Sequence, residues 1–249
     1  MRQESSLMSY RVLIPARLGS TRLPNKPLKQ ILGKTLLQRV VEQSKKSSAK
    51  SVHVATDSIE IIKHCDELNI ESILTSTEHQ TGSDRLAESC NILELDDEEI
   101  IINVQGDEPF IDPKDINQLA NLAISKEANM VTLFADLNKK EFADKNVVKI
   151  WLGSDSLVKD FSREMNHLKP DEAKKHLGIY GYKVSFLRSF VQWTRTINET
   201  KRNLEQMRAM DNGEKIYAIK SVGKYHIGVD TEIDLDEAIE IAKSLNESN

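Results

Sequence analysis

The segment Val12–Leu28 constrains the fold and the chemistry of this chain more than any other. It begins as a short apolar run and passes into a loop that carries Arg17, Arg22 and Lys26. Between Arg17 and Lys34 there are five basic residues and no acidic one, although the chain has a net charge of −5. A strand that opens into a basic loop with glycine and hydroxyl side chains is typical of a polyphosphate site.

The composition is that of a soluble globular protein. The 249 residues suffice for one large α/β domain, and no long charge run indicates a nucleic-acid or membrane partner. Two cysteines, Cys65 and Cys90, are too few for a disulfide framework and favour a reducing, cytoplasmic location. No apolar run reaches the roughly 18 residues of a membrane span. We expect residues 1–9 to be an N-terminal extension and residues 10–249 to form a single domain.

Apolar runs of strand length alternate with amphipathic segments of helix length in the first half of the chain. This alternation predicts a parallel sheet with right-handed helical crossovers. The run 99–104 is apolar almost throughout, which predicts a strand buried on both faces. We expect strands at 11–15, 51–56, 71–75 and 99–104, and helices at 35–47, 59–68, 83–93 and from Pro113 onward.

After about residue 129 the order of the predicted elements changes. Strand-like segments follow one another with turns between them, which predicts antiparallel pairing. We therefore expect an α/β fold with a mainly parallel sheet and an antiparallel elaboration in its second half. The predicted strands span 130–137, 146–152, 156–162, 176–184 and 215–222, and the predicted helices span 204–212 and 234–245.

The residue types in the loop after the first strand suit a triphosphate. Arg17 and Arg22 offer forked donors that match phosphate oxygens, and Lys26 adds a mobile point charge. Gly19 allows close backbone approach, and Ser20 adds a hydroxyl. The composition alone fits an ordinary solvated basic loop equally well. Its place after the first strand favours ligand binding, because open α/β sheets bind ligands at the carboxyl ends of their strands.

Two common phosphate motifs are absent from the sequence. The tripeptide Gly33-Lys34-Thr35 resembles the end of a P-loop, but that pattern requires glycine where this chain has Leu28. No GxGxxG pattern follows a predicted strand, which disfavours a dinucleotide-dependent oxidoreductase. The basic loop therefore predicts a phosphate site of another kind.

Carboxylates follow the strand expected at 99–104. The next five residues, 105–109, read Gln-Gly-Asp-Glu-Pro. Hard oxygen ligands at a strand end, facing a cationic loop, suit a magnesium ion that also binds phosphate. A simple turn explains such a sequence as well. A further acid, Asp230, precedes the last predicted helix, and nothing local pairs it with Asp107.

Six segments of the chain form a specific series: LIPARLGSTRLPNKPL, HQTGSDRLAE, NVQGDEPFI, HLGIYGY, LEQMR and GVDT. In this order they resemble the 3-deoxy-D-manno-octulosonate (KDO) cytidylyltransferases, also called CMP-KDO synthetases. The resemblance covers residues 10–245, and a more distant one exists to CMP-sialic acid synthetases. The first segment and NVQGDEP are its most specific parts, and LGIYGY points to the KDO branch.

The resemblance implies a Rossmann-like three-layer nucleotidyltransferase fold, usually as a homodimer. The implied activity is transfer of CMP from CTP to KDO, which gives CMP-KDO and pyrophosphate for lipopolysaccharide biosynthesis. The implied cofactor is Mg²⁺, held by Asp107 and Asp230. These two carboxylates, together with Arg22 and Lys26, would be the catalytic groups.

The resemblance also implies which residues bind the two substrates. The nucleotide would contact basic, hydroxyl and amide side chains: Arg17, Ser20, Arg22, Lys26, Thr75, Ser83 and Gln105. The sugar acid would contact a second set: Gln105, Arg163, His176, Tyr180, Glu205 and Gln206.

Two departures from the family pattern lie on the sugar side. After Arg163 the family commonly continues with a proline-containing segment and a second arginine, whereas residues 164–175 are shorter and different. The family also commonly has an acidic residue shortly before Leu204, where residues 200–203 read TKRN. These departures leave open a modified KDO, such as its 8-amino analogue, or another 2-keto-3-deoxy sugar acid. A catalytically silent nucleotide-binding module is a further alternative, disfavoured because both metal ligands are retained.

Overall fold

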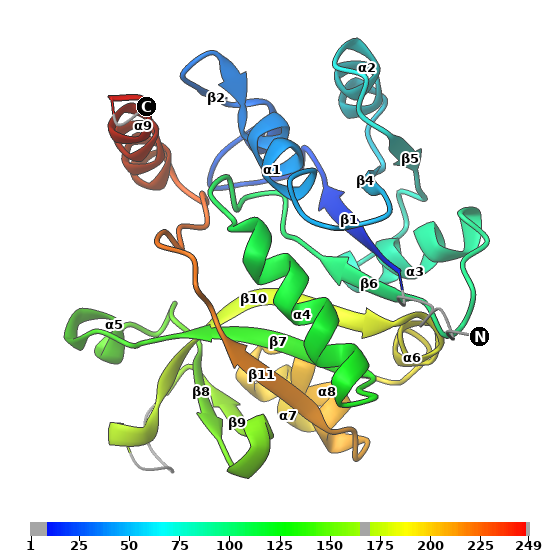
Figure 1. Ribbon diagram of the computed structural model, residues 1–249, viewed down its shortest axis with the longest axis vertical. Coiled ribbons are helices and arrows are strands. Elements are labelled where there is room, and N and C mark those ends of the chain that lie inside the picture. The colour runs from blue at the N-terminus through cyan, green and yellow to red at the C-terminus, as the bar shows by residue number, and fades with distance from the viewer. Residues whose placement is uncertain (1–8, 165–169, 248–249) are drawn as a thin grey trace, which may run out of the picture.

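The structure, a computed structural model, describes residues 9–164 and 170–247, and most of them surround one mixed sheet (Figure 1). The predicted extension 1–9 lies outside the described residues except for Ser9. In the first half, strands and helices alternate as the sequence predicts. The elements are β1 (Tyr10–Ala16), η1 (Lys26–Leu28), β2 (Gln30–Ile31), β3 (Lys34–Thr35), α1 (Leu36–Ser44), β4 (Val52–Thr56), α2 (Ile59–Glu67), β5 (Ser72–Leu74), α3 (Gly82–Ile92), β6 (Ile100–Asn103) and α4 (Pro113–Ser125).

The second half contains the predicted strands and several short helices between them. Of its elements, α5, α6 and α7 have no counterpart in the prediction, because each is too short to show a helical period. The elements are β7 (Met130–Ala135), α5 (Lys139–Ala143), β8 (Lys149–Leu152), η2 (Ser154–Ser156), β9 (Val158–Ser162), η3 (Pro170–Glu172), β10 (Lys174–Lys183), α6 (Val184–Phe190), α7 (Ile197–Arg202), α8 (Gln206–Asp211), β11 (Ile216–Lys220) and α9 (Glu232–Glu247).

The strand order of the sheet is β11-β7-β10-β6-β1-β4-β5. Strand β10 runs antiparallel to β6 and β7, whereas β6, β1, β4 and β5 pair in parallel. Strands β8 and β9 form an antiparallel pair attached to the start of β10. The predicted α/β fold, mainly parallel with an antiparallel elaboration in the second half, is confirmed.

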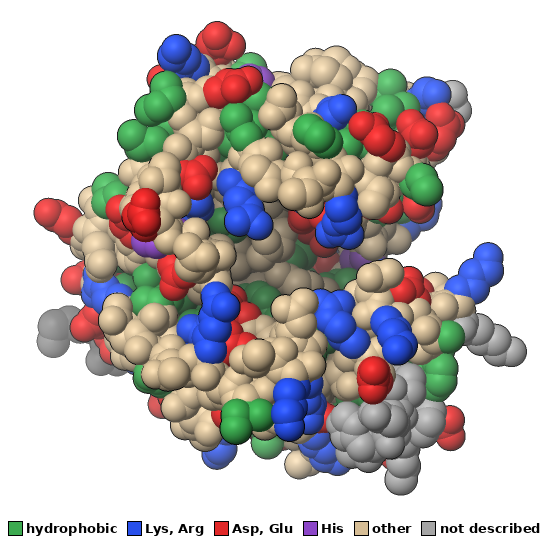
Figure 2. All heavy atoms as spheres, turned by 180° about the vertical axis from the view of Figure 1, so that it is seen from behind, with side chains coloured by type: hydrophobic (Ala, Val, Ile, Leu, Met, Phe, Trp, Pro, Cys, Tyr) green, Lys and Arg blue, Asp and Glu red, His purple; other side chains and the backbone are tan. Residues whose placement is uncertain are grey.

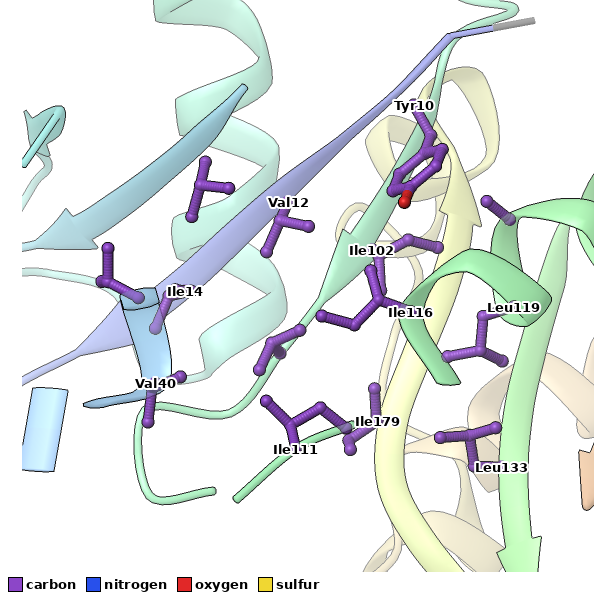
Figure 3. Close-up of a cluster of buried hydrophobic side chains, with 14 of the residues drawn as sticks. Tyr10, Val12, Ile14, Val40, Ile102, Ile111, Ile116, Leu119, Leu133 and Ile179 are labelled. Carbon is purple, nitrogen blue, oxygen red and sulfur yellow. The ribbon is translucent and has the colours of Figure 1, made fainter. Parts of the chain in front are cut away.

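Helices cover both faces of the sheet, which gives three layers (Figure 1). Alternate residues of β1 point to opposite faces: Val12 and Ile14 belong to the core with α1 and α4, and Leu13 to the core with α3, α6 and α8. Figure 3 shows Ile116 and Leu119 of α4 beside the strands in the first of these cores. Every residue of β6 is buried, as its apolar run predicts.

A third, smaller core joins the two ends of the chain. It contains Leu23, Ile31 and Leu36 from the first half together with Val229 and residues of α9. Leu23 and Val229 are fully buried. This cluster fixes the loop after β1 against the segment that precedes α9, although the two are far apart in sequence.

Candidate active site

The carboxyl ends of the parallel strands lie at one edge of the sheet, and their loops enclose a cavity of about 530 Å³. The loops after β1, β5 and β6 and the turn before α9 all contribute to its wall. Figure 2 shows a depression across the middle of one face of the protein, with Lys and Arg side chains on both sides of it. The lining residues include Arg17, Ser20, Arg22, Lys26, Arg85, Gln105, Asp107 and Asp230.

The basic loop after β1 is held by its own residues. The Ser20 Oγ atom accepts a hydrogen bond from the backbone of Leu23 at 3.3 Å, and the Leu23 side chain is anchored in the third core. Asn25 adopts a left-handed conformation (φ 53°), which turns the chain into the short helix η1. Lys26 is the first residue of η1, and Pro27 behind it is buried. The loop therefore presents its cations from a fixed backbone.

Lys26 connects the two carboxylates that the sequence alone cannot pair. Its Nζ atom lies 2.6 Å from Oδ2 of Asp107 and 2.8 Å from Oδ1 of Asp230. Arg22 approaches the other oxygen of Asp230, with Nη2 at 2.8 Å from Oδ2. The four residues implied to be catalytic are thus brought together at one point of the cavity.

Backbone contacts bring Asp107 and Asp230 to this point. The backbone nitrogen of Val229 donates a 2.9 Å hydrogen bond to the carbonyl oxygen of Asp107. Gly106 allows the β6 loop to pack against the end of β1, because a Cβ atom at this position would lie 2.8 Å from the carbonyl oxygen of Pro15. The backbone of Asp230 is held in turn by the Asp234 carboxylate, which accepts from the amides of Asp230 and Thr231.

Neighbouring charges in this cluster shift the pKa values of its ionisable side chains. Burial by itself would lower the pKa of Lys26, but the attraction of Asp107 and Asp230 outweighs it and raises that pKa. Burial raises the pKa of Asp230, but hydrogen bonds and charges of Lys26 and Arg22 outweigh this and lower it overall. Burial, reinforced by the adjacent Asp107 charge, raises the pKa of Glu108 to about 8. At neutral pH the Glu108 carboxyl is therefore largely protonated.

The residues implied to bind the nucleotide fall into two groups. Arg17, Ser20 and Gln105 line the cavity with Arg22 and Lys26. Thr75 and Ser83 lie behind its wall: Thr75 accepts a hydrogen bond from Arg85, and Ser83 donates to Glu205 at 2.9 Å.

Arg85 is a lining residue that sequence reasoning missed. It lies in the first turns of α3, and its side chain is only 5% exposed. The Asp57 carboxylate holds one guanidinium nitrogen at 2.6 Å, and Thr75 holds another. A buried arginine at the wall of a cavity lined by other basic side chains is a candidate group for binding an anionic ligand. Its sequence signal is its position one helical turn after the loop that follows β5.

The residues implied to bind the sugar acid lie around β10 and α8. A bulge in β10 between Leu177 and Tyr180 exposes the Gly178 carbonyl, which accepts from the Gln105 side chain at 3.3 Å. His176 and Tyr180 flank this bulge with ring centroids 5.4 Å apart. Gln105 thus connects the loop after β6 to β10.

The Glu205 end of this region contains one buried polar atom without a hydrogen-bond partner. Oε1 of Glu205 has no hydrogen-bond partner and lies 3.6 Å from the Arg208 guanidinium, and the neighbouring Gln206 is buried. Burial raises the pKa of Glu205 despite its hydrogen bond from Ser83. A carboxylate held from one side by Ser83 can accept further hydrogen bonds from a ligand hydroxyl group.

Arg163 lies apart from this group. Its Nη1 atom donates to the carbonyl oxygens of Lys145 and Asn146 at 3.3 and 3.1 Å, and it does not line the cavity. Much of the departing segment that follows it, residues 165–169, lies outside the described residues.

Residues 11–216 match the family model described as cytidylyltransferase. The chain is 39% identical to the 3-deoxy-manno-octulosonate cytidylyltransferase of Idiomarina loihiensis, over 94% of this chain and 99% of that protein. The chain belongs to this cytidylyltransferase family. It is also 38% identical to the family member of Proteus mirabilis, over 96% and 99% of the two chains.

Solved structures agree with this assignment to the cytidylyltransferase family. A CMP:2-keto-3-deoxy-manno-octonic acid synthetase in complex with CTP superposes with a TM-score of 0.87 at 32% identity, over 95% of this chain and 99% of that one. A cytidylyltransferase from Leptospira borgpetersenii, at 18% identity and a TM-score of 0.61, shares the fold.

The donor set at Asp107 and Asp230 fits a magnesium ion that arrives with phosphate. Mg²⁺ prefers oxygen ligands and is commonly held by one or two carboxylates plus substrate phosphates and water. Among the described residues no group of three or more His, Cys, Asp or Glu side chains could hold a metal ion by itself. Asp107 and Asp230, beside a basic loop suited to phosphate, match a Mg²⁺ site made of two carboxylates, substrate phosphates and water.

Proposed function

We propose that this protein transfers CMP from CTP to the anomeric C2 hydroxyl of KDO, with release of pyrophosphate, for lipopolysaccharide biosynthesis. The observation that carries the proposal is the convergence of Arg22, Lys26, Asp107 and Asp230 at one wall of the cavity. Membership of the cytidylyltransferase family supports the nucleotide, and the names of its relatives support the sugar acid.

The basic loop would bind the triphosphate. Arg22 is 63% exposed and reaches the cavity, so its guanidinium can turn toward a phosphate without breaking the core. Arg17 and Lys26 line the same wall and would share the charge of the leaving pyrophosphate. Because the loop backbone is fixed by Leu23 and Pro27, little conformational entropy is lost when the nucleotide binds.

The reaction is an in-line displacement at the α-phosphorus. The C2 oxygen of the sugar acid forms a bond to this phosphorus, the bond to the pyrophosphate oxygen breaks, and the hydroxyl proton passes to solvent. Asp107 and Asp230 would hold the Mg²⁺ ion, which would supply Lewis-acid activation of the hydroxyl and charge neutralisation on the phosphates. Gln105, Thr75 and Ser83 would define the nucleotide side of the cavity, either directly or through Arg85 and Glu205.

The sugar acid would lie against β10 and α8. His176, Tyr180, Glu205 and Gln206 would contact its hydroxyl groups. Arg163 could reach its carboxylate only by leaving the carbonyl oxygens of Lys145 and Asn146. The departing segments 164–175 and 200–203, and the engagement of Arg163 by loop carbonyls, favour a second candidate substrate. This is a modified KDO, such as its 8-amino analogue, or another 2-keto-3-deoxy sugar acid.

Assembly and location complete the proposal. We propose a homodimer in the cytoplasm, in line with the family resemblance. Cys65 and Cys90 are both free and buried, which suits a reducing compartment. Among the described residues, no helix has the length and apolar character needed to cross a membrane.

Pyrophosphate release in the presence of Mg²⁺ tests the proposal. The reaction is run with each of CTP, UTP, ATP and GTP, and with KDO, 8-amino-KDO and other 2-keto-3-deoxy acids. We expect release with CTP and KDO together. Release only with another acid would select the second candidate, and no release with any acid would favour a silent nucleotide-binding module.

A further inference from the structure

The Lys26 ammonium occupies the point at which the two carboxylates of the proposed metal site meet. Nζ donates to Oδ2 of Asp107 at 2.6 Å and to Oδ1 of Asp230 at 2.8 Å. The Lys26 side chain is only 15% exposed and that of Asp107 25%, so their contact is largely shielded from water, whereas Asp230 is 42% exposed. Such charge-assisted hydrogen bonds are about twice as strong as neutral ones. The two carboxylates are therefore partly neutralised, and both are oriented, by one cation that belongs to the chain.

A divalent cation would require oxygens of the same two carboxylates. It would bind them at about 2.0–2.1 Å, closer than an ammonium does, and its double charge would repel a neighbouring Lys26. We propose that Lys26 is a resident counter-ion of this site, which competes with the metal and moves to the triphosphate when nucleotide binds. This inference rests on the metal ligands named in the proposed function.

The cavity offers Lys26 a place to move. Its stem has four flexible carbons, and it lines the same wall as Arg17 and Arg22, the proposed triphosphate ligands. A bound triphosphate would draw the ammonium away and leave the carboxylate oxygens to the metal. Arg22 also donates to Oδ2 of Asp230 at 2.8 Å, so a second cation of the chain shares this carboxylate with Lys26. Binding of the metal and binding of the nucleotide are then coupled. Each ligand raises the affinity of the protein for the other by the same factor.

Mn²⁺ binding without nucleotide tests the inference directly. The probe is free Mn²⁺, measured by electron paramagnetic resonance during titration of the full-length protein. Lys26→Met removes the ammonium and keeps the apolar stem. We expect it to bind Mn²⁺ about tenfold or more tightly than the wild type. Mn²⁺ should also raise its melting temperature more than that of the wild type, because the metal replaces the lost positive charge.

Matched variants separate this effect from a general change of charge. Lys29→Met removes the same charge three residues away, where Lys29 pairs with Glu232 at 3.2 Å, and should bind Mn²⁺ within about twofold of the wild type. Lys26→Arg keeps the cation and should bind as weakly as the wild type. If the Lys26→Met variant fails to fold, the Lys26→Gln variant is used in its place. The glutamine amide also removes the charge, but it can still donate a hydrogen bond to one of the carboxylates.

Equal Mn²⁺ affinity in Lys26→Met and Lys29→Met would overturn the inference. The double variant Lys26→Met/Asp107→Asn shows whether the metal ligands themselves are assigned correctly. If its Mn²⁺ affinity equals that of Lys26→Met, the tightened site does not involve Asp107, and the metal part of the proposed function fails. If the affinity falls and Lys26→Met still binds no more tightly than the wild type, the counter-ion inference alone fails.

Discussion

The Nη2 atom of Arg22 lies 2.8 Å from Oδ2 of Asp230, across 208 positions of sequence. This ion pair joins the basic loop of the first strand to the turn that begins the last helix. Lys26 extends the contact to Asp107 in the loop after β6. Three distant segments therefore meet at one cluster of charges, and the chemistry proposed for the protein depends on that meeting.

Replacement of Arg22 tests the triphosphate contact. Arg22→Ala should lower kcat/KM for CTP by about tenfold to a hundredfold, since a hydrogen bond from a charged donor contributes about 1.5–3 kcal/mol. The melting temperature should change little, because the side chain is mostly exposed. Pyrophosphate release measures the activity. Arg195→Ala, an exposed arginine outside the cavity wall, is the matched control and should retain wild-type kcat/KM.

Replacement of Gly106 tests the close approach of the β6 loop to β1. The Cβ atom of Gly106→Ala would lie 2.8 Å from the Pro15 carbonyl oxygen, so the backbone beside Asp107 must shift. We expect a loss of about 1–3 kcal/mol in the free energy of unfolding and a marked fall in turnover. Gly19→Ala, in the same cavity, places its Cβ in open space and should leave stability unchanged. Equal effects of the two substitutions would rule out the clash.

The buried pair of Arg208 and Glu199 should dominate the stability of the α7–α8 region. Arg208 holds both Glu199 oxygens, at 2.8 and 2.5 Å, and both residues are buried. Arg208→Met leaves the Glu199 charge uncompensated and should cost about 3–5 kcal/mol in urea unfolding. The double variant with Glu199→Met should recover much of this loss. A double variant less stable than Arg208→Met would contradict the explanation.

His176 should make stability depend on pH. Burial lowers the pKa of His176 to about 3, whereas an unfolded histidine titrates near pH 6.5. The unfolded state therefore binds the additional proton first, and stability falls as the pH drops from about 6.5 toward 3.

Urea unfolding of the wild type and His176→Gln measures this contribution. Between pH 8 and pH 5 the wild type should lose about 2 kcal/mol more than the variant. At pH 8 and above, both side chains are neutral and the difference between the proteins should be constant. Parallel pH profiles down to pH 5 would show that the folded protein protonates His176 as readily as the unfolded chain.

Local sequence patterns predicted most of the fold. The largely apolar run at 99–104 predicted the burial of β6 on both faces, and the alternation of strands and helices predicted the parallel half of the sheet. Short helices such as α6 escaped prediction because Val184 continues the apolar pattern of β10. The change from strand to helix at that point is set by packing of Phe186 and Phe190 in the second core, which no local period reveals.

The sequence predicted the individual segments of the site but not all of the contacts between them. The basic loop and the carboxylate of Asp107 each follow a predicted strand, so their meeting at one sheet edge follows from topology. The position of Asp230 does not follow from the topology of the sheet. It depends on the Val229–Asp107 backbone hydrogen bond and on the packing of Leu23 near α9. The family resemblance supplied that pairing. The role of Arg85 depends on Asp57 and Thr75, which converge only in three dimensions.

Phosphorus NMR of the complete reaction tests the central claim most directly. The wild-type protein is incubated with CTP, Mg²⁺ and KDO, and the products are followed with time. We predict that the triphosphate resonances are replaced by one phosphodiester resonance, from CMP joined to the sugar acid, and by pyrophosphate in equal amount. Persistence of the CTP resonances with KDO and with every related 2-keto-3-deoxy acid would contradict the proposed cytidylyl transfer.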